Sequence, residues 1–209
     1  MDSHCDCRSA RPSARTQINL DELLADLISG DDACAEAAMQ ALAALGSEAL
    51  PALREIAASP APGQRWWAIS TLAQIEAVDV DWLIAALDDN AIEVQQSAVL
   101  GLTKHPHPKV ASALLDLLPS PNSILRNLTM NALIALGKDA IPALLTFIDE
   151  HKEKDSARIS AIRALASIAD TRAIPALMAA SEEDSALIQH WAEEGLENLG
   201  LDMVYMKLD

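Results

Sequence analysis

The same short pattern occurs six times along the chain, at a nearly constant step of about 31 residues. An anchor leucine marks each copy, and successive anchors are 30, 30, 31, 32 and 31 residues apart: Leu42, Leu72, Leu102, Leu133, Leu165 and Leu196. Small residues stand four positions and one position before each anchor, where helical periodicity places them near the anchor's side of a helix. A constant step of this length predicts stacked units that bury one another's apolar faces.

A second apolar segment follows each of the first five copies and predicts a second helix in each unit. These segments are "LPAL" (50–53), "VDWL" (80–83), "VASALL" (110–115), "IPALL" (141–145) and "IPALM" (174–178). Prolines stand in three of them and suit the first turn of a helix, where the missing amide proton costs no hydrogen bond. Glycines four residues after three anchors, Gly46, Gly137 and Gly200, are typical of helix ends. We therefore expect an all-α fold.

The repeated segments match a known consensus. "QRWWAISTLAQI" (64–75) and "LRNLTMNALIALG" (125–137) follow V-R-x-x-A-x-x-A-L-x-x-[IL]-G, and residues 31–200 resemble HEAT repeats of the E-Z type, found in phycobilisome lyase-like proteins. One copy departs from it, because Gln95 stands where the family usually has arginine. The resemblance implies a right-handed α-solenoid, or αα superhelix, of about five to six helical hairpins.

We expect one solenoid domain over residues 18–209. A capping helix at 18–30 opens it, the repeats fill 31–200, and a segment at 201–209 closes it, because the exposed ends of a solenoid need covers. Residues 1–17 show no periodicity and are predicted to be a disordered tail.

The chain is strongly acidic, with a net charge of −16 from 31 acidic and 15 basic residues. This charge favours a protein partner with a basic surface and argues against nucleic acid, whose phosphates it repels. The alternative interpretation is that the charge only keeps the molecule soluble.

The cellular setting is predicted from absent segments. No stretch reaches the about 18 to 20 apolar residues that cross a membrane, and no apolar signal core opens the chain, so we expect a cytoplasmic protein without membrane contact. Three cysteines, Cys5, Cys7 and Cys34, do not make a disulfide framework, which agrees with a reducing compartment.

No motif predicts a catalytic residue, a cofactor or a metal site. Deoxyhypusine hydroxylase, which uses the same kind of repeat, holds iron with His-Glu dipeptides, and none of the five histidines here precedes a glutamate. "HCDC" (4–7) offers soft metal ligands but lacks a second ligand pair. "HPHP" (105–108) has two histidines that a metal could bridge, but its alternating prolines are more typical of a rigid turn.

One polar column runs through the repeats seven residues before each anchor. Its members after the first repeat are Arg65, Gln95, Arg126, Arg158 and Gln189. We expect a structural polar ladder in which each arginine meets loop acids such as Asp88, Asp89, Asp155 or Asp184.

Candidate partner-binding residues come from two places. The second helices of such a solenoid line its concave surface, and there the chain offers Arg54, Glu55, Trp82, Asp88 and Asp149. On a first helix, Trp66 lies about 120° from the anchor on the polar side, whereas its neighbour Trp67 falls in a packed column. Trp66 is therefore a candidate contact, and the alternative is a half-exposed ring lying on a neighbouring aliphatic stem.

These observations predict a non-enzymatic scaffold or adaptor, as a monomer or in a small complex, that binds a basic protein. Two alternatives stay open. One, implied by the resemblance, is a bilin lyase-like or chaperone activity on a tetrapyrrole-carrying protein. The other is an acidic inhibitor or immunity-like protein that masks a basic toxin or nuclease.

Overall fold

The computed structural model describes residues 19–152 and 156–201, and within these ranges the regular structure is helical throughout. The predicted disordered tail, "HCDC" and the closing segment after Leu201 lie outside the described residues. The chain divides into two compact units, one ending at Val78 and the other beginning at Asp79, and each is described by itself. The single domain expected over 18–209 therefore stays a prediction.

The first unit contains four α-helices in its described part. They are α1 (Leu20–Leu27), α2 (Asp32–Leu45), α3 (Leu50–Ala57) and α4 (Pro62–Leu72), with the 3-10 turn η1 (Gly46–Glu48) after α2. The side chains of Asn19 and Asp31 cap α1 and α2 by accepting backbone amide protons. Helix α1 packs against α2. Cys34 is buried on α2.

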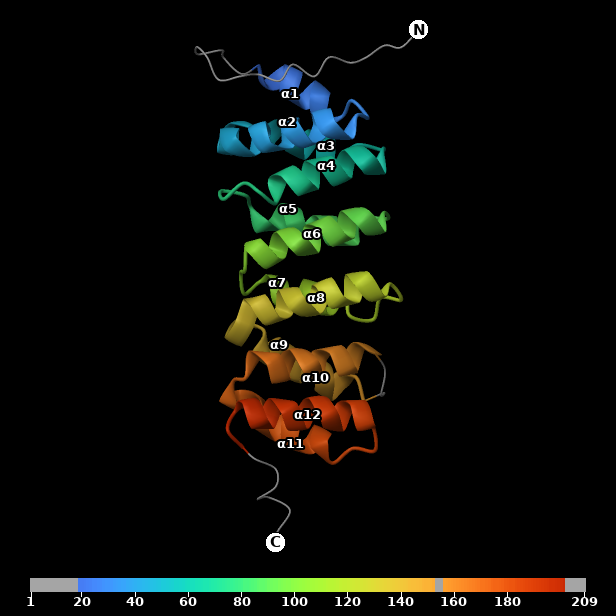
Figure 1. Ribbon diagram of the computed structural model, residues 1–209, viewed down its shortest axis with the longest axis vertical. Coiled ribbons are helices and arrows are strands. Elements are labelled where there is room, and N and C mark those ends of the chain that lie inside the picture. The colour runs from blue at the N-terminus through green and yellow to red at the C-terminus, as the bar shows by residue number, and fades with distance from the viewer. Residues whose placement is uncertain (1–18, 153–155, 202–209) are drawn as a thin grey trace. The chain divides into compact units, whose positions relative to one another are not determined.

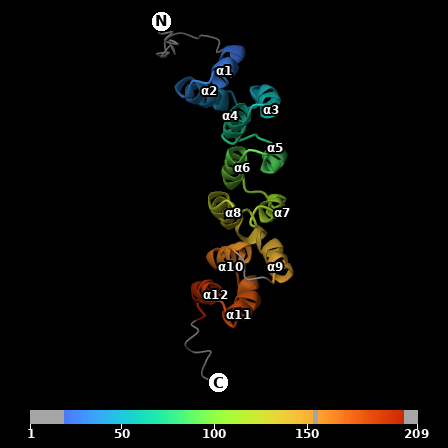
Figure 2. The same cartoon turned by 90° about the vertical axis from the view of Figure 1, so that its right-hand side faces the viewer.

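The second unit arranges its helices in two layers. Helices α6, α8, α10 and α12 form one layer by contacting each other in chain order, and the shorter second helices α5, α7, α9 and α11 form the other (Figures 1 and 2). The bounds are α5 (Val80–Ala85), η2 (Ala86–Asp88), α6 (Ile92–Lys104), α7 (Val110–Leu115), α8 (Ser123–Leu136), η3 (Gly137–Asp139), α9 (Ile141–Glu150), α10 (Ser156–Ile168), η4 (Thr171–Ala173), α11 (Ile174–Ser181) and α12 (Ala186–Asn198).

The anchor leucines form the core of both units, as the repeat predicts. All six are at most 1% exposed, and burying each leucine contributes about 1.5 to 3 kcal/mol. The column four residues before the anchors is buried as well, and where it holds Thr129, the hydroxyl donates to the carbonyl of Leu125 at 2.8 Å. Gly46, Gly137 and Gly200 end or follow first helices with positive φ, as predicted. The all-α repeat fold is thus confirmed.

The polar column is real, and one of its arginines meets a loop acid as predicted: Arg158 pairs with Glu183 in the turn between α11 and α12. The other members bond differently. Four members donate a hydrogen bond to the backbone carbonyl six residues earlier, just beyond the preceding second helix: Arg65 to Ser59, Gln95 to Asp89, Arg126 to Ser120 and Gln189 to Glu183, at 3.0, 2.8, 2.6 and 2.6 Å. For Arg126 the predicted acidic partner is wrong. The carbonyl lies past the helix end without an intrahelical donor, and the side chain satisfies it.

Candidate functional site

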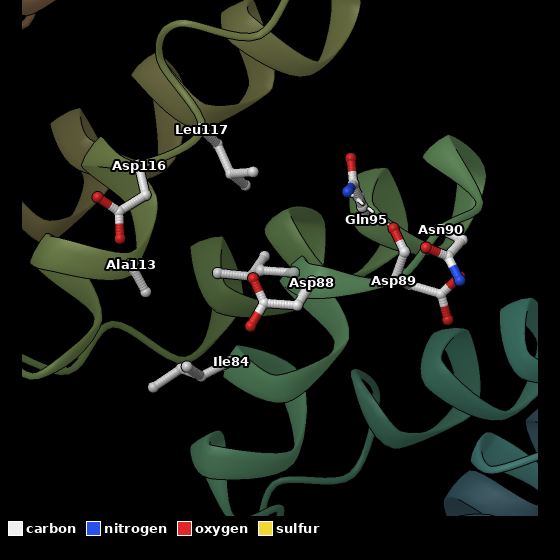
Figure 3. A pocket seen from close by; sticks show the side chains of 9 residues that line it. Ile84, Asp88, Asp89, Asn90, Gln95, Ala113, Asp116 and Leu117 are labelled. Atoms are coloured by element: carbon white, nitrogen blue, oxygen red, sulfur yellow. Dashed lines mark hydrogen bonds between the residues drawn. The ribbon is translucent and has the colours of Figure 1, made fainter.

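A surface cleft opens in the second unit between the neighbouring second helices α5 and α7. Its volume is about 460 Å³, and we call it the acidic cleft (Figure 3). Its lining residues are Ile84, Leu87, Asp88, Asp89, Asn90, Gln95, Ala113, Asp116 and Leu117.

Local hydrogen bonds hold the wall of the acidic cleft that follows η2. The carboxylate of Asp89 accepts the amide proton of Ala91 at 2.8 Å, and the Gln95 side-chain amide donates to the Asp89 carbonyl at 2.8 Å. The polar column of the repeat therefore also shapes this cleft. Asp88, at the end of η2, lies near the middle of the cleft, and Asp116 lies on the α7 side (Figure 3).

Two carboxylates of the acidic cleft are available to a ligand. Asp88 and Asp116 are both exposed, and within residues 19–152 and 156–201 neither carboxylate takes part in a hydrogen bond or an ion pair. Ile84 and Leu117 provide apolar surface beside them (Figure 3). This combination suits a lysine or arginine side chain, whose aliphatic stem lies on apolar surface while its charged end meets carboxylates. Among the described residues, no group of three or more His, Cys, Asp or Glu side chains has the arrangement of a metal site.

A second cleft, of about 400 Å³, lies between α7 and α9. We call it the Phe147 cleft, and its lining residues are Ser112, Leu115, Asp116, Pro119, Ala143, Thr146, Phe147, Glu150 and His151. The rings of Phe147 and His151 stack with their centroids 3.9 Å apart and their planes at 17°, and Nδ1 of His151 lies 2.8 Å from the Phe147 carbonyl oxygen. Asp116 lines both clefts.

Of the candidates predicted on second helices of this unit, one lines a cleft described above. Asp88 lies in the acidic cleft, whereas the half-buried Trp82 on α5 lines neither cleft. Asp149 is exposed on α9 but pairs with Lys152, and this hydrogen bond and the charge of Lys152 lower the pKa of Asp149. A carboxylate that already has a cation is a weaker attractor for a partner's cation.

The other candidates lie in the first unit. Arg54 and Glu55 are exposed on α3. The rings of Trp66 and Trp67 on α4 meet edge to face, with centroids 4.7 Å apart and an interplanar angle of 75°. Both tryptophans are half-buried, so Trp66 keeps exposed surface for a contact while it also packs on its neighbour.

Asp116 and Phe147 were not among the residues predicted from the sequence. Asp116 stands two residues after the buried Leu114 of its second helix, and the predicted Glu55 stands two residues after the buried Leu53. That shared register was the signal that could have found Asp116. Phe147 is the single phenylalanine of the chain and lies on a second helix, which was a signal too.

Comparison with known proteins gives one family. The model of HEAT repeats matches residues 80–150 and 130–197. A 69-residue stretch is 45% identical to phycocyanobilin lyase subunit beta of Nostoc sp. (strain PCC 7120), covering 32% of this chain and 34% of that protein. The match therefore spans about a third of the length of this relative.

Solved structures show the same fold at low sequence identity. An archaeal HEAT-like repeats protein from Thermococcus onnurineus NA1 has a TM-score of 0.60 and 20% identity, over 88% of this chain and 82% of that one. The complex of CpcE and CpcF of phycocyanin lyase from Nostoc sp. PCC7120 has a TM-score of 0.52 and 20% identity, over 92% of this chain and 81% of that one. A designed armadillo repeat protein in complex with the peptide (KR)4 has a TM-score of 0.52 and 18% identity, over 87% of this chain and 99% of that one.

Proposed function

The chain belongs to the HEAT repeat family, and we propose that it is a non-enzymatic scaffold that holds a basic segment of a partner protein in the acidic cleft. The observation that carries the proposal is the pair Asp88 and Asp116, two exposed acids that line one cleft and have no cation of their own among the described residues. A partner's lysine or arginine supplies that cation.

The charge of the whole chain supports the same partner. A net charge of −16 attracts a basic protein over a distance, and added salt weakens this attraction because the screening length falls to about 8 Å at physiological ionic strength. The designed armadillo protein of the same fold was solved with a peptide of alternating lysine and arginine, so a surface of this architecture can accommodate such a segment.

The test is binding of a fluorescently labelled (KR)4 peptide, measured by anisotropy at several salt concentrations. Asp88→Asn and Asp116→Asn should each weaken binding by about 1.4- to fivefold, since an exposed ion pair contributes about 0.2 to 1 kcal/mol. The matched control is Asp149→Asn, which removes the same charge from a residue that pairs with Lys152 and lines neither cleft. If all three variants weakened peptide binding equally, the loss would reflect net charge alone, and the acidic cleft would not be the binding site.

Trp66 is proposed as an additional contact on the first unit. Trp66→Ala should leave the circular dichroism spectrum intact and weaken binding of the full-length partner, because tryptophan is enriched among interface residues that dominate affinity. Arg54, Glu55 and Trp82 are the other proposed contacts, and their alanine variants are compared in the same assay. If Trp66→Ala left the affinity for the partner unchanged, Trp66 would only pack against Trp67 and would not be a binding contact.

A bilin lyase-like or chaperone activity is the second candidate function. It is favoured by the 45% identity over 69 residues to phycocyanobilin lyase subunit beta. The test is to add phycocyanobilin, with and without an apo-phycocyanin subunit, and to record visible absorbance. The scaffold proposal expects neither a spectral shift nor a covalent adduct. A shift or an adduct would instead support a lyase-like activity. The propionates of a bilin are anionic, so such a ligand would be repelled from the acidic cleft.

Inhibition of a basic toxin or nuclease is a special case of the first proposal. It uses the same acidic surface and differs in what the bound protein does. Loss of a captured partner's activity on binding would identify this case.

A further inference from the structure

We infer that the acidic cleft and the Phe147 cleft are consecutive subsites for one extended partner segment, with a basic side chain in the first and an apolar side chain in the second. The inference rests on the proposed function, because it assumes that the acidic cleft binds a basic residue. It adds a sequence requirement for the partner, which charge alone does not contain.

The two clefts share one lining residue. Asp116 follows α7 and lines both of them, so a chain that places a cation near Asp116 is already at the edge of the Phe147 cleft. Each cleft lies between two neighbouring second helices, α5 and α7 for the first and α7 and α9 for the second. The subsites therefore repeat with the step of the helices.

The lining of the Phe147 cleft combines apolar residues with acidic ones. Leu115, Pro119, Ala143 and Phe147 contribute the apolar lining, with Leu115 and Phe147 themselves largely buried. Asp116 and Glu150 are exposed acids of the same lining. An apolar side chain within a basic segment fits this arrangement, since the acids favour the charges that flank it. An acidic or anionic occupant would be repelled by the same two carboxylates.

The aromatic wall is fixed before any ligand arrives. His151 stacks on Phe147 at 3.9 Å between centroids, and its Nδ1 is 2.8 Å from the Phe147 carbonyl oxygen at the end of α9. A wall that is already ordered costs less conformational entropy when it binds a side chain.

The helix step sets the spacing of the two side chains. Packed helices lie about 8 to 10 Å apart, and a polyproline II segment rises about 3.1 Å per residue and returns to the same side every three residues, which is about 9 Å. The partner's basic and apolar residues are therefore expected three positions apart, in either chain direction.

The experiment uses the full chain and four labelled peptides with a proline pair between the test residues: Arg-Pro-Pro-Leu, Arg-Pro-Pro-Ser, Leu-Pro-Pro-Arg and Ser-Pro-Pro-Arg. In at least one direction, the leucine peptide should bind about tenfold more tightly than its serine counterpart, as expected for burial of most of a leucine side chain. Asp88→Asn should weaken the leucine and serine peptides by equal factors and keep their ratio.

A variant that fills the second subsite tests its location. Thr146 is exposed on α9 and lines the Phe147 cleft, so Thr146→Trp should reduce the leucine preference to about one. Ala179→Trp is the matched control: Ala179 is exposed at the equivalent position of α11, two residues after a buried leucine, and lines neither cleft. It should keep the preference.

The outcomes separate this inference from the proposed function. Equal binding of leucine and serine peptides in both directions, or a leucine preference that survives Thr146→Trp, would overturn the second subsite and leave the basic-segment proposal standing. Failure of both (KR)4 and all four peptides to bind would overturn the proposed function itself.

Discussion

Arg158 and Glu183 form a bidentate ion pair in the second unit, in which Nη1 and Nη2 of the guanidinium donate to the two carboxylate oxygens at 2.7 and 2.6 Å. Arg158 lies on α10, and Glu183 lies in the turn between α11 and α12. The side chain of Arg158 is 7% exposed and that of Glu183 is 23% exposed. The backbone carbonyl of Glu183 also accepts the bond from Gln189, so this turn is held from two helices.

Removing the carboxylate of this pair should strongly destabilise the second unit. Glu183→Ala leaves the Arg158 charge buried without that partner, and breaking a buried pair costs about 3 to 5 kcal/mol of unfolding free energy. The double variant Arg158→Met with Glu183→Ala should recover most of the loss, because no buried charge remains. Urea unfolding followed by circular dichroism measures both, and a double variant no more stable than the single one would contradict the argument.

Arg126 tests the polar column, where its Nη1 donates to the carbonyl of Ser120. Arg126→Ala should lower the unfolding free energy by about 1.5 to 3 kcal/mol, the range for a hydrogen bond to a charged group. Arg126→Gln is the matched control, because Gln95 and Gln189 make the same bond at the same register. The melting temperature should fall in the alanine variant and stay near that of the wild type in the glutamine variant. An unchanged melting temperature for Arg126→Ala would show that the bond is not stabilising.

The fold could be predicted from the sequence because the residues that form its core recur at a regular step. Anchor leucines recur every 30 to 32 residues, and each of them is buried. The helix ends were predictable for a local reason, since a glycine such as Gly137 adopts a positive φ that other residues avoid.

The site was less predictable, because a cleft depends on two helices at once. Asp88 and Asp116 are separated by 28 positions, and only the packing of α5 beside α7 brings them to one cleft. The predicted partner of Arg126 was wrong for a similar reason: sequence shows side-chain acids but does not show which backbone carbonyls lack a donor. Lys152, three residues after Asp149, was a local signal that this acid is paired.

Gly195 allows a close approach that alanine would not. A Cβ at this position of α12 would lie 2.8 Å from the Cα and Cβ of Ala166 on α10. Gly195→Ala should therefore lose about 1 to 3 kcal/mol through overpacking, although alanine favours helix by up to about 1 kcal/mol. The control is Gly63→Ala on α4, where a Cβ meets nothing within 4 Å and helix propensity should give a small gain. Stabilisation by both substitutions in urea unfolding would mean that α10 and α12 can separate at little cost.

Asp170 links η4 to the preceding hairpin through Arg172. Its carboxylate accepts bonds from Nε and Nη2 of Arg172 at 2.8 and 3.0 Å and from the Arg172 amide at 3.0 Å, and Nη2 also donates to the Lys138 carbonyl at 3.0 Å. The side-chain hydrogen bonds from Arg172, followed by its backbone bond, lower the pKa of Asp170 from 3.8 to about 2.

This lowered pKa makes the stability of the chain depend on pH in the acid range. Because the folded-state pKa is below the unfolded one, the bonds of Asp170 stabilise the fold above pH 4 and lose that effect as the pH falls towards 2. The melting temperature of Asp170→Asn should therefore lie below that of the wild type at neutral pH, and the two should converge between about pH 4 and pH 2. In an Arg172→Ala background the same substitution should cost less stability, since the guanidinium donors are gone and only the backbone amide of residue 172 remains. A difference that stays constant from neutral pH down to 2 would mean that the Asp170 charge does not contribute, and that only the shape of the side chain does.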